Sequence, residues 1–264
     1  MPILTLGFLG LVFGIGLAIA SKRFAVQIDP RLEKIHSLLP GSNCGACGGA
    51  GCFGFAEAVL SGKLSVDACR VSDEAAKEKI AEILGKKLEK KTKRVAVLHC
   101  NGGKKVKDRF SYQGIEDCTA ANLVLGGQKE CVFGCLGLGT CANVCPFDAI
   151  KMSDEGLPVV DEIKCKACGK CVIACPKKLF TLVPITKIYA VRCMSLDSGK
   201  KVMEACRVGC IACHKCEKAC PVSAIKVIDN LARIDYNICE NKGECFKVCP
   251  THAIAKKENL VWRS

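Results

Sequence analysis

The cysteines between residues 131 and 176 constrain the fold of this chain more than any other feature. The second half of this stretch reads C-x2-C-x2-C-x3-C-P, from Cys165 to Pro176. Such a run places three thiolates on one [4Fe–4S] cube, while the fourth cysteine, before the proline, ligates a neighbouring cube. Two runs therefore exchange their last cysteines. This pattern predicts one cluster on Cys131, Cys135, Cys141 and Cys175 and a second on Cys145, Cys165, Cys168 and Cys171.

The composition indicates that clusters, rather than large side chains, organise the fold. Of the 264 residues only 5% are aromatic, whereas 23 are cysteine. In a secreted protein so many cysteines would suggest disulfides. The repeated runs that end in Cys-Pro instead indicate thiolate ligands in a reducing compartment. We therefore expect the cysteine-rich part of the chain to lie in the cytosol.

The N-terminal segment has the properties of a membrane anchor. From Pro2 to Ala20 no residue is charged, and this length suffices for a helix to cross a bilayer. Lys22 and Arg23 follow at once, and by the positive-inside rule they place the rest of the chain on the cytoplasmic side. A cleaved signal peptide is the alternative, because residues 18–20 resemble a cleavage site, but its positively charged n-region is missing.

A glycine-rich cysteine segment follows this anchor. Residues 39–52 contain three cysteines, and a fourth lies downstream at a spacing of C-x2-C-x4-C-x16-C. The glycines let the backbone wrap closely around a bulky cofactor and offer amide N–H groups to its sulfides. These four residues predict a separate [4Fe–4S] cluster, with structural zinc as the alternative: Cys44, Cys47, Cys52 and Cys69.

An internal repeat extends the cysteine pattern to a second module. Residues 129–146 align without gaps on residues 204–221, so that Cys131 matches Cys206. The repeat predicts a further cluster on Cys210, Cys213, Cys216 and Cys249. In the first module Leu138 occupies the slot of Cys213, and we expect Cys131 to supply the missing ligand. In the second module Lys242 replaces a cysteine, so the type of a fifth cluster is left open on Cys220, Cys239 and Cys245.

The positive charge of the chain is concentrated between residues 77 and 109. The formal net charge is +13, and this stretch holds twelve Lys or Arg against four acidic residues. Its first part, residues 73–93, predicts a helix that ends in lysines. The charge indicates either a solvated helix face or a surface that attracts an acidic redox partner or anionic lipid. Nucleic acid is not expected, because no aromatic residues are interleaved for base stacking.

These features predict an α+β chain of small iron–sulfur domains. We expect a transmembrane anchor at residues 1–23 and a helical [4Fe–4S] domain with a C-terminal basic helix at 24–93. Two ferredoxin-like modules, each of the bacterial two-cluster kind, should follow at 94–190 and 191–264. Cys100, Cys118, Cys193 and Cys206 belong to no run and have no assigned role, although Cys193 or Cys206 could complete the fifth cluster.

The order of these features resembles one known family. The apolar N-terminal helix, the segment 39–52 with Cys69, and the sequence Gly-Cys-Leu-Gly-Leu-Gly at 134–139 followed by Cys141 and Cys145-Pro146 are together similar to the B subunit of the Rnf complex. The similarity covers nearly the whole chain, and the second module resembles the longer B subunits. In that family Leu138 is part of the pattern, whereas Lys242 departs from it.

The resemblance implies an electron-transfer subunit of a membrane-bound, ion-translocating ferredoxin:NAD oxidoreductase. Such a protein would accept electrons from soluble reduced ferredoxin and relay them through [4Fe–4S] clusters to other subunits in the cytoplasmic membrane, with lipid around its single helix. No side chain is expected to act as acid, base or nucleophile. The chain has no dinucleotide fingerprint and no P-loop, so we expect NAD reduction and ion movement in other subunits.

Three alternative functions remain open at the level of sequence. A membrane-anchored polyferredoxin could serve a hydrogenase or another reductase. A structural protein could hold zinc and never change redox state, although zinc sites usually pair two C-x2-C knuckles across a longer gap. An iron–sulfur sensor for nucleic acid would need a DNA-reading element, and we find none in the sequence.

Overall fold

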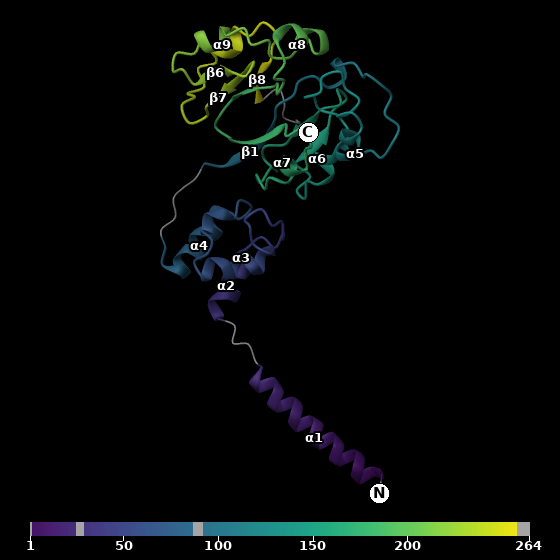
Figure 1. The fold of residues 1–264 in the computed structure, drawn as a ribbon. Coiled ribbons are helices and arrows are strands. Elements are labelled where there is room, and N and C mark those ends of the chain that lie inside the picture. The colour runs from purple at the N-terminus through teal and green to yellow at the C-terminus, as the bar shows by residue number, and fades with distance from the viewer. Residues whose placement is uncertain (1, 25–28, 87–91, 258–264) are drawn as a thin grey trace.

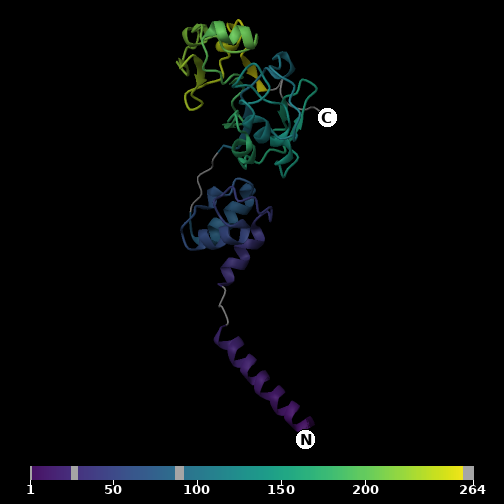
Figure 2. The same ribbon diagram turned by 45° about the vertical axis from the view of Figure 1, so that its right-hand side comes forward.

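The computed structural model describes residues 2–24, 29–86 and 92–257, and the remaining residues appear as a grey trace in Figure 1. The described chain has four parts in sequence order: one long helix, a helical domain and two modules. Each of the two modules combines short helices with two-stranded antiparallel sheets. Figures 1 and 2 show these parts in a row, from the long helix to the second module. This mixture of elements confirms the expected α+β class.

The first helix, α1 (Pro2–Arg23), ends on the predicted basic pair. Within the described part of the chain it is the one helix that is long and apolar enough to cross a membrane. Its apolar side chains face outward all round, and those of Leu6, Phe8 and Leu17 are 69%, 69% and 70% exposed. A helix with this pattern requires lipid or another apolar helix around it.

The helical domain consists of three α-helices and a short 3-10 turn: α2 (Pro30–Leu38), α3 (Gly51–Leu60), Val66–Ala68 and α4 (Glu74–Leu84). Asp29 caps α2 by accepting the Arg31 N–H, and Pro30 at the first position favours the helical φ. Ile35, Phe55 and Ile80, one from each helix, are at most 1% exposed and form the apolar core.

The predicted helix at 73–93 is shorter than expected. It ends at Leu84, because Gly85 adopts a left-handed φ of 64° and closes the last turn. Part of the expected basic end, residues 87–91, lies outside the described residues.

The first module begins with β1 (Arg94–Leu98), in which the four residues after Arg94 are apolar and buried. It pairs antiparallel with β4 (Phe180–Pro184), so that Leu98 lies opposite Phe180. Between these strands lie α5 (Cys118–Leu123), α6 (Thr140–Asn143), the pair β2 (Ile150–Met152) and β3 (Pro158–Val160), α7 (Lys170–Ala174) and a 3-10 turn at Gly103–Lys105. The first strand therefore pairs with the last, and the two middle strands pair with each other.

The second module repeats this topology. β5 (Tyr189–Val191) pairs with β8 (Ile254–Lys256), and β6 (Ile225–Ile228) pairs with β7 (Leu231–Ile234). Its helices are α8 (Gly199–Ala205), α9 (Lys215–Lys218) and α10 (Glu244–Lys247). The strand pairing assigns Tyr189 and Ala190 to this module, just before the boundary expected at 191. Residues 258–264 of that expected module lie outside the described residues.

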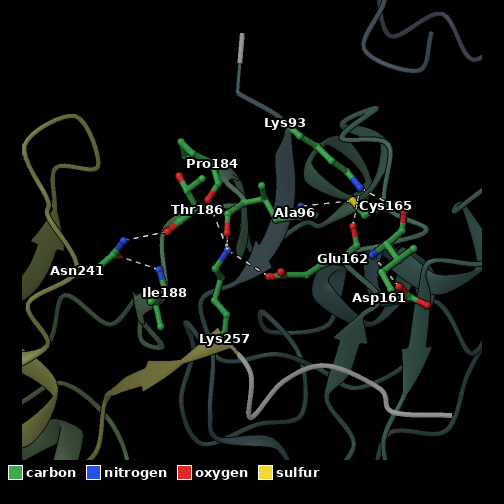
Figure 3. A network of polar contacts seen from close by, with 12 residues as sticks. Lys93, Ala96, Asp161, Glu162, Cys165, Pro184, Thr186, Ile188, Asn241 and Lys257 are labelled. Atoms are coloured by element: carbon green, nitrogen blue, oxygen red, sulfur yellow. Dashed lines mark hydrogen bonds and ion pairs between the residues drawn. The ribbon is translucent and has the colours of Figure 1, made fainter. Parts of the chain in front are cut away.

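Polar contacts hold the second module against the first (Figure 3). Lys257, directly after β8, is 5% exposed, and its Nζ lies 3.1 Å from a Glu162 carboxylate oxygen. The same ammonium donates to the Ile185 carbonyl at 3.1 Å. The Asn241 side chain accepts the Ile188 N–H at 3.0 Å and donates to the Thr186 carbonyl at 2.9 Å. Two side chains of the second module therefore fix the connection between β4 and β5, and one of them also pairs with the first module.

Candidate iron–sulfur centres

The structure brings the four predicted cysteines of the helical domain together. Cys52 lies in the first turn of α3, where its N–H donates to Asn43 Oδ1 at 2.7 Å. A side chain at Gly51 would collide with the same oxygen, because an added Cβ would lie 2.8 Å from it. Burial raises the pKa of the Cys69 thiol, and nearby Cys47 and Cys44 raise it further. The glycine-rich loop and the turn before Cys69 thus form one thiol group.

Four other predicted cysteines surround a single cavity in the first module. The lining of this cavity includes Cys145, Cys165, Cys168 and Cys171. The Ala96 N–H of β1 points at Cys165 Sγ at 3.5 Å, and the Ala149 N–H points at Cys145 Sγ at 3.4 Å. Such N–H donors stabilise thiolate sulfur and tune the potential of a cluster that it ligates.

The second module contains an equivalent cavity. Its lining includes Cys210, Cys213, Cys216 and Cys249. Burial raises the pKa of Cys216 to about 12, and the other three thiols add to that shift. Ala167 and Ala212 take the same left-handed conformation in the two modules, with φ of 52° and 54°. The repeat in sequence is therefore a repeat in ligand-loop geometry.

The three cysteines expected at the fifth centre also lie together. Burial raises the pKa of Cys245 to about 11, and Cys239 and Cys220 raise it further. Lys242, in the slot of a second cysteine, has a side chain that is 58% exposed and lies 3.5 Å from Glu240. The buried phenol of Tyr236 lies within electrostatic range of Cys239 and Cys245, and burial raises its pKa. Three thiols and a phenol thus surround this centre.

The remaining predicted group is arranged differently from the expectation. The structure places Cys131 at another cavity, and Cys118 lies beside Cys141 and Cys175 instead. Burial raises the pKa of Cys141 to about 12, followed by the effects of Cys118 and Cys175. Gly137, with φ of 79°, has the same left-handed conformation as Ala167 and Ala212, each of which lies two residues after the first cysteine of its ligand loop. By this correspondence, Cys135 is the first cysteine of its own loop. Cys131 precedes that loop and is turned away from it.

A short polar network places Cys118 at this group. The Cys118 N–H donates to Thr140 Oγ1 at 2.7 Å, and the Thr140 hydroxyl donates to the Asp117 carboxylate at 2.8 Å. Asp117 also caps α5 by accepting the N–H groups of Thr119 and Ala120. These bonds tie the first turn of α5 to α6, which carries Cys141. Cys118 was missed because no ligand spacing connects it to Cys135; the one signal was the absence of cysteine at Leu138.

This arrangement suits a cluster better than a single ion. Within residues 2–24, 29–86 and 92–257, no three His, Cys, Asp or Glu side chains converge as one metal ion requires. The thiols instead surround cavities, with backbone N–H groups directed at their sulfurs. Ligation converts thiols to thiolates, so a bound cluster reverses the effect of burial on these cysteines. Four thiolates around one cavity are the donor set of a [4Fe–4S] cluster.

Comparison with protein families agrees with this donor chemistry. Residues 39–71 match the family described as "Putative Fe-S cluster". Residues 129–179 and 209–253 each match a family described as "4Fe-4S dicluster domain". The chain thus carries several [4Fe–4S] centres, distributed over the helical domain and both modules.

Curated relatives are similar to this chain over nearly its whole length. It is 46% identical to the B subunit of the Na(+)-translocating ferredoxin:NAD(+) oxidoreductase complex of Acetobacterium woodii, over 97% of this chain and 77% of the relative. It is 43% identical to the proton-translocating counterpart of Clostridium ljungdahlii, over 96% and 91%. Identity to the B subunit of the ion-translocating oxidoreductase complex of Methanosarcina acetivorans is 40%, over 96% of both chains. The chain therefore belongs to the family of B subunits of the Rnf complex, the ion-translocating ferredoxin:NAD(+) oxidoreductase.

Proposed function

We propose that this electron-transfer protein carries single electrons from reduced ferredoxin to other subunits of the complex in the membrane. The adjacency of its thiol groups is the observation that supports this role. Phe147 and Cys168 of the first module pack against the core of the helical domain. Burial raises the pKa of Cys168, and the nearby Cys44 of the helical domain raises it further. Two centres from different domains therefore adjoin.

The series of neighbouring thiol groups continues within the first module. Burial raises the pKa of Cys171 to about 12, and its charged neighbours include Cys141 of the next group. Electrons can tunnel between neighbouring centres, and this step requires no proton transfer or group transfer. The [4Fe–4S] clusters supply the one-electron chemistry, and the protein supplies thiolates, spacing and burial.

The structure favours a revised set of ligands for the first module. We propose Cys118 in place of Cys131, while the other predicted groups stand as the sequence predicts them. The proposed groups are Cys44, Cys47, Cys52 and Cys69; Cys145, Cys165, Cys168 and Cys171; Cys118, Cys135, Cys141 and Cys175; Cys210, Cys213, Cys216 and Cys249; and Cys220, Cys239 and Cys245. The proposed domain division is 1–23, 24–93, 94–188 and 189–264, which follows the strand pairing.

The order of the parts supports one direction of electron flow. The helical domain comes directly after the membrane helix in the chain, and the second module lies at the far end of the row (Figures 1 and 2). The pair Lys22-Arg23 supports a cytoplasmic position for the cysteine-rich bulk. We therefore place ferredoxin at the modules and the exit at the centre on Cys44, Cys47, Cys52 and Cys69.

Exposed lysines offer a docking surface for an acidic ferredoxin. Lys104, Lys105 and Lys107 are all exposed on the loop that follows β1. Lys105 lies within electrostatic range of the Cys206 thiol. Electrostatic steering by such a surface raises the association rate and makes it sensitive to ionic strength. Replacement of these three lysines by glutamate should raise the KM for ferredoxin, with less effect on kcat, and flatten its salt dependence.

The exit assignment is tested by the Cys69→Ser variant of the full complex. The variant should retain the reduced EPR signals of both modules in the presence of reduced ferredoxin, yet pass no electrons to the other subunits. Cys213→Ser is the matched control, because it removes a ligand from a centre at the opposite end. Unchanged NADH formation by the Cys69→Ser complex would show that electrons leave elsewhere.

A further inference from the structure

Four cysteines lie outside the five thiol groups described above. Cys100 follows β1, Cys193 follows β5, Cys131 precedes the first ligand loop of its module, and Cys206 ends α8. All four line one cavity between the two modules. Each module therefore contributes two cysteines to a shared space.

The four residues are related by the internal repeat. Cys131 and Cys206 are equivalent in the gap-free alignment of residues 129–146 with 204–221, and Cys100 and Cys193 each follow the first strand of a module. The backbone N–H of the preceding residue donates to an equivalent carbonyl in each module: His99 to Leu179 at 2.7 Å, and Arg192 to Ala253 at 2.6 Å. The two modules thus contribute equivalent pairs of cysteines to the cavity.

The side chains next to these cysteines cross the interface reciprocally. His99 Nδ1 lies 2.7 Å from the Val191 carbonyl oxygen of the second module. In the other direction, Arg192 donates through Nε and Nη2 to the Cys100 carbonyl at 3.1 Å and 2.7 Å. Both side chains are buried. These contacts join the segment that carries Cys100 in the first module to the segment that carries Cys193 in the second module.

Glycine residues lie close to the sulfurs of these cysteines. A Cβ added at Gly102 would lie 3.6 Å from Cys206 Sγ and 3.7 Å from Cys100 Sγ, so sulfurs from both modules face one glycine. The equivalent glycines Gly134 and Gly209 each place an added Cβ 3.7 Å from a sulfur, that of Cys131 and that of Cys193 respectively. The backbone therefore comes close to all four sulfurs, as it must around a bulky inorganic group.

The charges at this cavity favour an anion. Arg192 is 3% exposed, and its guanidinium donates to the Cys100 carbonyl. Asp197 also lines the cavity, but among the described residues no carboxylate forms an ion pair with Arg192. Burying a charge without compensation is costly. A thiolate-ligated iron–sulfur cube carries net negative charge and would compensate it. The Cys135 N–H and the Ser195 N–H, directed at Cys100 Sγ and Cys193 Sγ at 3.4 Å each, are further donors for such an anion.

We propose that Cys100, Cys131, Cys193 and Cys206 ligate a sixth [4Fe–4S] cluster, shared between the two modules. Its lining contains four cysteines, as do the linings of the two cavities that the ferredoxin-like runs enclose. Assembly replaces four thiol protons by four Fe–S bonds and releases the protons to solvent. Every cysteine of the chain then belongs to a centre.

The site also connects the two modules electrically, an aspect that rests on the proposed electron relay. Cys100 is a charged neighbour of Cys135 in the first module, and Cys193 is a charged neighbour of Cys210 in the second. The shared cluster would accept one electron from the second module and pass one electron to the first, without net chemical change. The shared cluster would therefore connect the centres of the second module to those of the first.

The test is the iron and sulfide content of the anaerobically purified full-length chain. The double variant Cys193→Ser/Cys206→Ser should lose about four irons and four sulfides, one cube, relative to wild type. Cys131→Ser/Cys206→Ser should lose the same amount, because both residues belong to one cluster. The proposal would be overturned if either double variant kept the wild-type iron and sulfide content. A loss of about eight irons in Cys131→Ser/Cys206→Ser, or zinc in this site of the wild-type chain, would also overturn it.

A milder variant guards against misfolding of these double variants. Arg192→Met should leave the iron content unchanged and lower the reduction potential of one EPR signal, since removal of a positive charge disfavours the reduced cluster; Arg192→Lys should restore most of the shift. A potential unchanged for every signal would contradict the site. The relay is tested separately: wild-type chain with full iron content that passes no electrons would refute the proposed function and leave the sixth cluster intact.

Discussion

The ion pair between Lys257 and Glu162 should control how firmly the two modules stay together. Lys257 follows β8 of the second module, and its side chain is 6% exposed, while that of Glu162 in the first module is 22% exposed. The ammonium also donates to the Ile185 carbonyl at 3.1 Å and the Pro184 carbonyl at 3.5 Å (Figure 3). Lys257→Met removes the ammonium and keeps an unbranched apolar stem of similar length.

The size of the effect follows from what the substitution leaves behind. Removal of one partner from a buried ion pair costs about 3 kcal/mol at the low end, which applies because water reaches part of the Glu162 carboxylate. The two carbonyls lose a donor at about 1 kcal/mol each. Burial of the methionine side chain returns about 2 kcal/mol. The net cost of about 3 kcal/mol increases opening of the interface about a hundredfold, at 1.4 kcal/mol for each factor of ten.

Hydrogen exchange measures this opening directly. Amides of β5 and β8 in the anaerobic, cluster-loaded chain should lose about a hundredfold in protection, whereas those of α3 in the helical domain should not change. Lys256→Met is the matched control, because it removes the same charge from a half-buried neighbour. Lys257→Met/Glu162→Gln should recover much of the protection, since no carboxylate is left unpaired. Equal protection in Lys257→Met and Lys256→Met would refute the reasoning.

Three further predictions concern single sites. Cys118→Ala should change or remove the EPR signal of the centre on Cys135, Cys141 and Cys175, whereas Cys131→Ala should leave that signal intact; the opposite pattern would restore Cys131 as its ligand. Leu11→Arg in α1 should cost about 3 kcal/mol of membrane insertion and reduce the fraction of chain that resists alkaline extraction, with Leu11→Ala as control. In the reduced, iron-free chain, burial raises the pKa of the Cys141, Cys171 and Cys216 thiols to about 12, above the ordinary value of 9.0. These thiols favour the folded state below about pH 9, so its Tm should fall as the pH rises toward 12, and a rising Tm would contradict the burial argument.

The sequence was most informative where ligands are close together in the chain. The run from Cys165 to Cys175 and its repeat from Cys210 to Cys220 predict their loops, because a cube can only be reached at short, fixed spacings. The same holds for α1, whose uncharged length is a local property. Topology also followed from the repeat, since two segments with matching cysteines and apolar strands fold in the same way.

The sequence was least informative where ligands come from distant parts of the chain. Cys118 reaches its group through the Asp117 and Thr140 contacts, which a spacing rule cannot contain. Cys100 and Cys193 are brought together by the docking of two modules, through His99 and Arg192. The helix predicted to reach residue 93 ends at Leu84, because Gly85 adopts the left-handed conformation that closes the last turn. The positions of these cysteines depend on tertiary contacts, whereas the helix end reflects a local glycine signal that the sequence contains.

The most direct test of the electron relay is freeze-quench EPR of the anaerobic complex after mixing with reduced ferredoxin and NAD. The account predicts that the iron–sulfur signals of this protein appear before NADH forms, and that a complex in which this protein lacks iron forms no NADH from ferredoxin. NADH formation at the normal rate by a complex that contains the folded, iron-free protein would contradict the account.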